Sequence, residues 1–246
     1  MPPKQKALRA RLSPEGRKAT ILRTARKLFA ETGHEDFLPA EVARRAGISE
    51  ATIYRYFPTK RDLLVTLAEE WLSEILEEEP DFAQLGDVFT QLRHVVRYCF
   101  LVIRREPMLS RFVLTVLRTD PNYRAMEIYR LNRRFTASIT SVLDAATNTG
   151  LFRKDVSAKL LRDIIFGAVE HQTWAFLRGE GDFPTDSAAD AIAELIFRGM
   201  IAPTADAKKA TAAIEKLKGL TQSIEDQAGA LRAAIADVEY SAMRLK

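Results

Sequence analysis

The feature that most constrains this chain is a helical spacing of apolar residues that continues through nearly all of its 246 positions. Apolar residues recur three and four positions apart, whereas alternating runs bounded by Asn-Gly or Asp-Gly turns are absent from the sequence. Helical spacing gathers apolar side chains on one face of a helix, while a half-buried strand needs strict alternation. The sequence therefore predicts an all-α fold with proline and glycine at the breaks between helices.

The N-terminal third carries start and stop signals for helices. Four are predicted, over about 14–32, 39–46, 49–56 and 60–79. Ser13 is a capping residue for the first helix, and Thr59 with Asp62 forms a near capping box for the fourth. Gly33 and Gly47 end the first and second helices, because glycine accepts a left-handed backbone.

The middle of the chain reads as an antiparallel helical bundle. Its helices are expected near 84–104, 107–118, 122–148, 157–178 and 187–200. Asp120 followed by Pro121 indicates a capped start for the third of these. The breaks between them have the short lengths typical of connections in helical bundles.

After Pro203 the composition becomes rich in alanine and charged residues. Every seventh residue there is apolar: Leu217, Ile224, Leu231, Val238 and Leu245. The companion seam is weak, so a strong autonomous coiled coil is not expected. We interpret the segment as an extra amphipathic helix whose apolar stripe needs a partner, either this protein's own body, the same segment of a second subunit, or another protein.

Charge divides the chain unevenly. Through Lys60 there are 13 Lys and Arg against six Asp and Glu, and the remainder carries 24 against 27. A compact basic segment on a slightly acidic body is typical of a polyanion-binding module joined to something else, although a basic tail also serves solubility. We expect four regions: a basic N-terminal arm over 1–13, a three-helix DNA-binding domain over 14–60, an effector and dimerisation domain over 61–203, and a heptad-like extension over 204–246.

The two short helices around Gly47 form a candidate helix-turn-helix motif. The second of them, residues 49–56, would lie in the major groove of DNA. Ile48 and Ile53 have the spacing of a hydrophobic staple that sets the angle at which this helix begins. Its inward residues are expected to be Ala51 and Ile53, with Phe57 after them. Its outward residues are Thr52, Tyr54, Arg55 and Tyr56, which can reach phosphates or base edges.

The stretch ILRTARKLFAETGHEDFLPAEVARRAGISEATIYRYFPTKRDLL closely resembles the DNA-binding domain of the TetR family of bacterial transcription regulators. Its landmarks include Phe29 and Gly33 in the first helix, Gly47 in the turn, and Tyr54 in the third helix. The resemblance implies an all-helical homodimer whose variable C-terminal bundle binds a small effector.

The resemblance also implies DNA contacts by Thr52, Tyr54, Tyr56 and Lys60. Together with the helix opening, the outward arginine and the basic start of the first helix, the expected DNA-binding residues are Ser49, Thr52, Tyr54, Arg55, Tyr56, Lys60, Arg17 and Lys18. The basic arm before them either follows flanking DNA or is a solvated tail. One position departs from the family pattern. Leu38 stands where members usually have Thr or Ser, so the phosphate contact of the second helix is in doubt.

The segments FVLTVLRTDPNYRAMEIYRLNRRF and GLFRKDVSAKLLRDIIFGAVEHQTWAFLRG are loosely similar to the effector domain of the fatty-acid-degradation repressors of that family. This similarity implies a small apolar effector, with long-chain acyl-coenzyme A as the candidate. The expected pocket residues are Phe100, Arg104, Phe112, Val116, Tyr129, Arg133 and Phe166. Arginine suits nucleotide phosphates because it binds them bidentately. The alternative is that the aromatic residues form core and that the arginines form surface ion pairs.

In this family the two helices that correspond to 157–178 and 187–200 form the dimer interface. The residues expected there are Gly167, His171, Trp174, Ala191 and Leu195. Small residues on such helices permit close approach of a symmetry-related copy.

No catalytic motif, metal-ligand spacing or phosphate loop occurs in the sequence, so no catalytic residue, cofactor or metal is expected. The basic N-terminus has no apolar stretch behind it, and a cytoplasmic, nucleoid-associated protein without membrane contact is expected. The predicted function is a ligand-responsive homodimeric repressor, released from a pseudo-palindromic double-stranded operator by its effector. The alternative is an interaction or scaffolding protein that acts through the C-terminal amphipathic helix, with DNA binding secondary.

Overall fold

A computed structural model describes residues 13–243, and every regular element among them is a helix. Residues up to Met200 and residues from Ile201 onward form two separate compact units. Of the basic arm predicted over 1–13, only Ser13 lies within the described residues. The last three residues of the chain also lie outside them. No helix of the described part has the length and apolarity that crossing a membrane requires.

The N-terminal helices begin and end where their capping residues predict. They are α1 (Pro14–Thr32), α2 (Pro39–Ala46), α3 (Glu50–Tyr56) and α4 (Lys60–Glu78). The Ser13 hydroxyl accepts from the Gly16 N–H, and Thr59 with Asp62 forms a complete capping box. These side chains satisfy backbone N–H groups that have no partner inside the helix, which is why local sequence locates the boundaries well.

The bundle contains more irregular helix than the sequence predicts. Its elements are η1 (Phe82–Gln84), α5 (Val88–Arg105), α6 (Pro107–Phe112), η2 (Val113–Leu117), η3 (Tyr123–Ala125), α7 (Glu127–Asn148), α8 (Ala158–Leu177) and α9 (Thr185–Met200). The helix expected over 107–118 changes from α to π geometry at Val113. The long helix expected from 122 begins only at Glu127.

The late start of α7 has a local cause. Asp120 does not cap that helix but accepts from the Asn122 N–H, which closes a turn before η3. Met126, the residue before α7, makes no side-chain capping bond. The expected start at Asp120 and Pro121 is therefore wrong, because the same two residue types also favour a tight turn.

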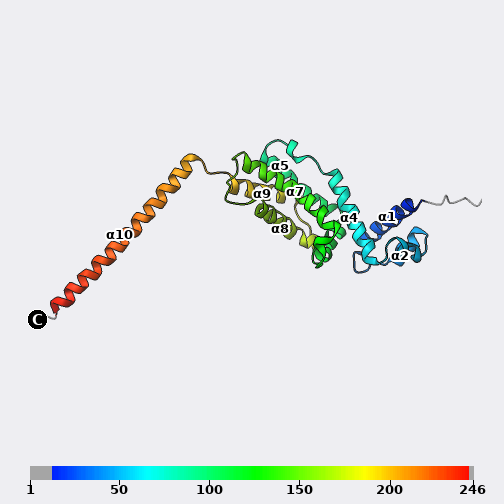
Figure 1. Cartoon of the computed structure of the whole chain (residues 1–246), viewed down its shortest axis with the longest axis horizontal. Coiled ribbons are helices and arrows are strands. Elements are labelled where there is room, and N and C mark those ends of the chain that lie inside the picture. Colours follow the sequence, from blue (N-terminus) through cyan, green and yellow to red (C-terminus); the bar gives the residue numbers. More distant parts are fainter. Residues whose placement is uncertain (1–12, 244–246) are drawn as a thin grey trace, which may run out of the picture. The chain divides into compact units, whose positions relative to one another are not determined.

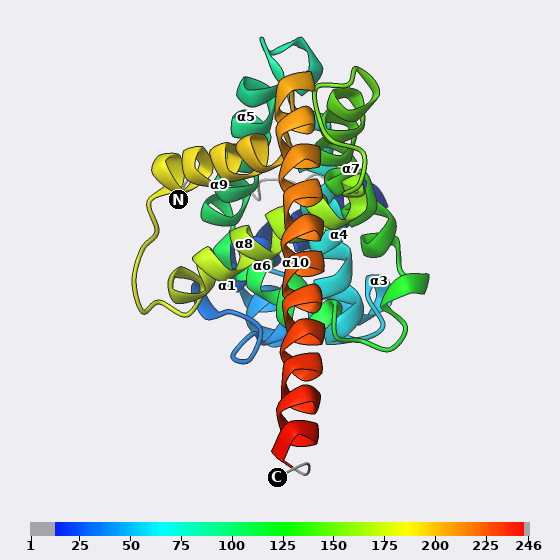
Figure 2. The same ribbon diagram turned by 90° about the vertical axis from the view of Figure 1, so that its left-hand side faces the viewer.

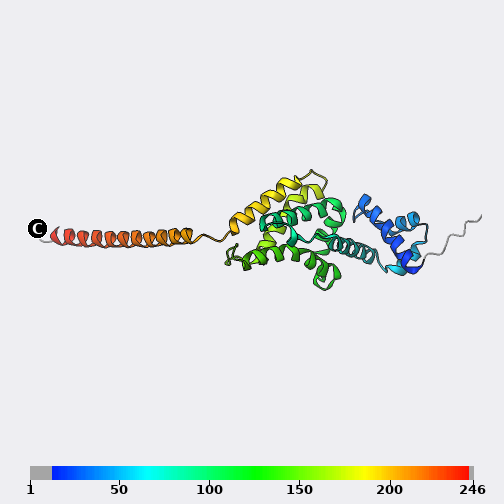
Figure 3. The ribbon, with the colours of Figure 1, turned by 90° about the horizontal axis from the view of Figure 1, so that it is seen from above.

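One continuous core holds the first unit together. It runs from Ile21 in α1 to Met200 at the end of α9. Helix α4 links the N-terminal helices to the bundle (Figures 1 and 3), and one face of α4 contributes seven buried residues to that core. The N-terminal helices and the bundle therefore share apolar packing and are not joined only by a flexible linker.

The second unit consists mainly of a single helix, α10 (Ala205–Met243). Figure 2 shows it as one continuous helix, although Gly219 and Gly229 lie in its interior. Its large apolar residues over 214–231 are more than half exposed. An apolar stripe of this kind agrees with the predicted amphipathic extension.

Candidate DNA-binding and effector sites

The turn between α2 and α3 has helix-turn-helix geometry. Gly47 has φ 66° and ψ 36°, a left-handed conformation that favours glycine because it has no Cβ. Ser49 follows in extended backbone, and its Oγ accepts from the Thr52 N–H at 3.3 Å. Ile53 is buried and Ile48 packs against the same core, so the two residues of the predicted staple hold α3 at a defined angle.

Helix α3 presents polar and aromatic side chains on its free side. Tyr54 is 42% exposed and Arg55 is exposed, with its guanidinium 5.3 Å from the centre of the Tyr56 ring. The Thr52 hydroxyl lies 2.8 Å from that of Ser49. Ile53 is buried and Ala51 is exposed, so the expectation that Ala51 faces inward is wrong.

Three of the basic residues predicted to bind DNA lie in the N-terminal turns of α1 and α4. Lys60 begins α4 with its Nζ 3.5 Å from the Glu35 carbonyl oxygen, and the exposed Lys18 lies over the Phe57 ring at 5.9 Å. Arg17 is half-buried in the first turn of α1. The N-terminal turns of α1 and α4 thus carry cations, and Lys18 lies beside the residue that ends α3, where a basic side chain suits a phosphate contact.

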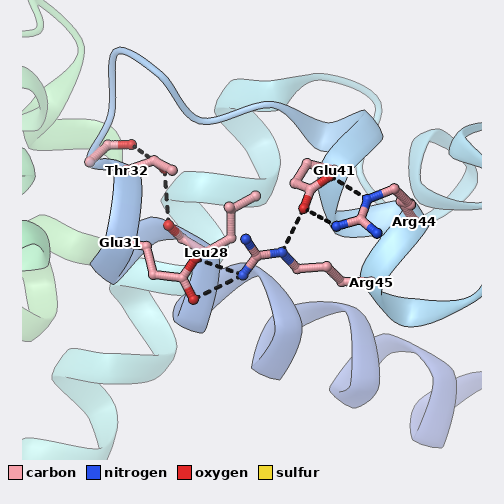
Figure 4. A network of polar contacts seen from close by, with 7 residues as sticks. Leu28, Glu31, Thr32, Glu41, Arg44 and Arg45 are labelled. Atoms are coloured by element: carbon pink, nitrogen blue, oxygen red, sulfur yellow. Dashed lines mark hydrogen bonds and ion pairs between the residues drawn. The ribbon is translucent and has the colours of Figure 1, made fainter.

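Helix α2 is held by charge rather than by a cap. Leu38 precedes it, is 60% exposed and makes no capping bond. Glu41 instead accepts hydrogen bonds from Arg44 and Arg45, and Arg45 also binds Glu31 of α1 at 2.7 Å (Figure 4). The two arginines lower the pKa of the Glu41 carboxyl to about 2. This network ties α2 to α1.

The bundle contains an apolar cavity of about 90 Å³. It is lined by α4, α5, α6, η2, α7 and α8, and its residues include Trp71, Cys99, Val102, Ser110, Val113 and Phe135. Burial raises the pKa of the Cys99 thiol to about 12, so this cysteine is protonated at neutral pH. It contributes apolar surface and is not a reactive thiolate.

A second, cationic cavity of about 520 Å³ adjoins the apolar one. Four arginines and one lysine line it, against a single carboxylate: Arg118, Arg124, Arg133, Lys159, Arg162 and Asp163. The hydrogen bond from Arg133, with the charges of Arg124 and Arg162, lowers the pKa of Tyr129. Such a cluster is an electrostatic site for an anion with several phosphate oxygens.

The two cavities share Arg118, Asn132 and Phe166. Arg118 also binds Glu170 at 3.0 Å, and that residue lines the apolar side. One elongated molecule could therefore place an apolar part among the buried residues and an anionic part among the arginines.

Among the predicted pocket residues, the structure brings Tyr129, Arg133 and Phe166 together. Phe112 and Val116 line a different cavity, between the end of α1 and α6. Phe100 and Arg104 line neither effector cavity. Phe100 packs on Phe183 with ring centres 5.2 Å apart.

Arg104 has a structural role. Its guanidinium binds Asp182 and the Phe183 carbonyl oxygen, both at 2.8 Å, and lies 4.4 Å from the centre of the Phe183 ring. These contacts attach α5 to the loop before α9. The sequence predicts Arg104 as a pocket residue because arginine suits phosphates. In the structure it pairs instead with Asp182, in an acidic loop far away in the sequence.

Trp71, Asn132, Lys159 and Arg162 line the cavities but are not among the pocket residues that the sequence predicts. The last two offered a signal, because Lys159, Arg162 and Phe166 are spaced by three and four residues and so lie on one face of α8. Trp71 and Asn132 offered none, since only the packing of α4 against α7 and α8 brings them to the cavities.

Charged and aromatic contacts join the DNA-binding helices to the bundle. Arg26 of α1 binds Glu74 of α4 at 2.7 Å and Glu106, between α5 and α6, at 2.9 Å. The His34 ring stacks on Phe112 of α6 with centres 5.1 Å apart. Burial, together with the nearby charge of Lys60, lowers the pKa of His34. A displacement of α6 would therefore also displace the residues at the end of α1, through the contact of Phe112 with His34.

The residues predicted at a dimer interface lie on an accessible face of α8 and α9. Gly167, His171 and Ala191 are exposed and Trp174 is half-buried. Leu195 is 75% exposed, which is unusual for a leucine in a well-packed bundle. Leu160 and Ile164, each about half exposed, extend this apolar surface along α8.

The comparisons with known proteins agree with this architecture. Residues 21–67 match the family model for bacterial regulatory proteins of the tetR family, and residues 86–200 match a tetracyclin repressor-like C-terminal domain. The fatty acid metabolism regulator protein of Bacillus subtilis is 21% identical over 181 residues, which cover 73% of this chain and 93% of that protein. The HTH-type transcriptional repressor KstR2 of Rhodococcus jostii is 24% identical, over 76% of this chain and 93% of that protein.

Among solved structures, FadR from Bacillus subtilis in complex with stearoyl-CoA has a similar fold. The TM-score is 0.63 at 21% identity, over 74% of this chain and 98% of that one. FadR from Bacillus halodurans gives a TM-score of 0.60 at 20% identity, over 73% of this chain and 97% of that one. Both family models, the helix-turn-helix geometry and the all-helical bundle lead to one conclusion. The chain belongs to the TetR family of bacterial transcriptional regulators.

Proposed function

We propose that this protein is a homodimeric repressor that acts at the nucleoid in the cytoplasm and is released from its operator by an acyl-coenzyme A. The observation that carries the effector is the apolar cavity adjoining a cavity with five cations. An acyl chain fits the first by its chemistry, and the phosphates of coenzyme A fit the second. Similarity to a regulator solved with stearoyl-CoA supports the same class of ligand.

The apolar cavity must widen to admit a long chain. Its volume is about 90 Å³, whereas an engineered cavity in another protein that binds benzene has a volume of about 150 Å³. Side chains in a close-packed core leave little other room, so the chain must displace the helices that line the cavity. Ligand binding then favours a second arrangement of the bundle, which is the requirement for an effector.

The helix over 107–117 is placed to transmit that displacement. Ser110 and Val113 on this helix line the apolar cavity, while Phe112 and Val116 face the end of α1. The stacking of Phe112 on His34 couples the two sides. We expect the α3 helices of the two subunits to change their separation, so that they no longer match half-sites about one helical turn or more apart.

The test is fluorescence anisotropy on labelled DNA from the gene's own upstream region. Stearoyl-coenzyme A is titrated into the complex at fixed salt, with free coenzyme A as the ligand control. Release by the acyl form alone supports the proposal. Tight DNA binding that the ligand does not change would contradict acyl-coenzyme A as the effector. Absence of DNA binding would contradict the proposed operator in this upstream region.

Two variants locate the sites. Tyr54→Ala should weaken DNA binding by tenfold or more while the oligomeric state is unchanged, since a lost base contact costs about 1–3 kcal/mol.

Arg133→Ala should raise the ligand concentration needed for release by about tenfold. Arg130→Ala is its matched control, because Arg130 lies on the same helix, is exposed and pairs with Glu127. Equal effects of the two arginine variants would contradict the cationic cavity as the head-group site.

A further inference from the structure

Two polar atoms at the apolar cavity have no hydrogen-bond partner. Among the described residues, four buried side-chain polar atoms lack a partner, and the Trp71 Nε1 and Ser110 Oγ atoms are two of them. Both residues line the apolar cavity, and each is only 4% exposed. They come from different helices, α4 and α6, and converge on one site.

Buried polar groups in native proteins are nearly always satisfied, because an unsatisfied donor loses its hydration without compensation. The other residues of this cavity are mostly aliphatic and aromatic, and its two acceptor side chains, Asn132 and Glu170, make no hydrogen bond to either group. A cavity of about 90 Å³ exceeds the roughly 10–15 Å³ that one water molecule needs, so a small ligand group has room beside these two residues.

The position of these two donors shows that the ligand group that faces them is not at the head-group end of the ligand. Trp71 and Ser110 line the apolar cavity but not the cationic cavity, whereas Asn132 lines both. Ser110 and Arg118 are eight residues apart, which is about two helical turns along the segment from α6 through η2. A thioester at the junction therefore lies beside Asn132, and the two donors lie farther along the acyl chain.

We propose that the effector's acyl chain carries a carbonyl oxygen in its middle portion, which accepts hydrogen bonds from Trp71 Nε1–H and Ser110 Oγ–H. A keto oxygen has two lone pairs, so it can accept from both donors at once. This inference rests on the proposed acyl-coenzyme A function and narrows it to oxygenated chains. A plain alkyl chain would leave both donors buried without partners.

The experiment compares 12-oxostearoyl-coenzyme A with stearoyl-coenzyme A by isothermal titration calorimetry on the full chain. The two ligands share chain length and head group and differ at one carbon. The keto ligand should bind the wild type about tenfold more tightly or better, since two donors gain partners. Equal affinities would overturn the inference while leaving the proposed function intact. Binding of neither ligand would overturn both.

Variants assign the preference to the two donors. Trp71→Phe and Ser110→Ala should each reduce the preference for the keto ligand, and the double variant should abolish it. The ratio of the two affinities is the readout, because any change in cavity size affects both ligands. Ser141→Ala on α7 is the control, since it lies outside the apolar cavity. DNA binding by each variant verifies folding, and an unchanged preference in the double variant would contradict the assignment.

Discussion

Leu38 shows how a single residue departs from the family pattern. It takes the capping position of α2, where its carbonyl oxygen accepts from the Glu41 and Val42 N–H groups, but its side chain makes no capping hydrogen bond and is 60% exposed. Leu38→Ser should stabilise the fold by about 1 kcal/mol, because a serine there can accept from an N–H of the first turn. The free energy of unfolding from urea denaturation measures this, with Leu38→Ala as the control. An equal gain in the alanine variant would show that removing an exposed leucine is responsible.

Glu41 makes a specific prediction about acid stability. Its pKa in the folded protein, about 2, lies below the ordinary value of 4.5. The stabilisation by its ion pairs is therefore fully present above about pH 4.5 and is lost as the pH falls toward 2. Glu41→Gln should show a smaller drop in Tm between pH 5 and pH 3 than the wild type. Glu77→Gln, an exposed glutamate of α4, is the control, and a wild-type drop in Glu41→Gln would exclude this contribution.

At the scale of elements, the π-helical turn η2 is the segment that sequence patterning describes least well. The apolar residues over 113–117 fit an ordinary helix, yet the backbone there takes a wider turn. Insertions of this kind occur often at functional sites, and here η2 lines the apolar cavity through Val113 and Leu114. The apolar pattern does not distinguish the two geometries here, because five residues make little more than one turn of either helix.

Helix α10 is the element whose partner the sequence left open. No described residue after Met200 belongs to the core of the first unit. Deleting 204–246 should therefore leave operator binding unchanged and shift the Tm of the body by only a few degrees. Thermal unfolding and anisotropy of the truncated protein test this. Aggregation of the truncated protein would instead mean that α10 covers apolar surface of its own body.

At the scale of the whole molecule, the exposed apolar face of α8 and α9 predicts the mode of self-association. Leu195→Glu should convert a dimer into a monomer, since the variant would bury a charge in the interface proposed for these two helices. Sedimentation velocity measures this. Leu217→Glu on α10 is the matched control, because Leu217 is 62% exposed and Leu195 75%. Dissociation by Leu217→Glu alone would assign dimerisation to α10.

The sequence by itself determined the helices of the DNA-binding region and the direction of most of their side chains. Ser13, Gly47, Ser49 and Thr59 act on backbone groups within a few residues, so their effect is readable from local sequence. The family resemblance added the expectation that Thr52, Tyr54 and Tyr56 of α3 contact DNA.

Only the tertiary structure decided which residues line the two cavities of the bundle. It assigned Arg104 to an ion pair with Asp182, separated Phe112 from the apolar cavity, and placed Trp71 and Ser110 there together. These residues are brought together by helix packing across large sequence separations. Local patterning records which face of a helix is apolar, but it does not record which distant side chain that face meets.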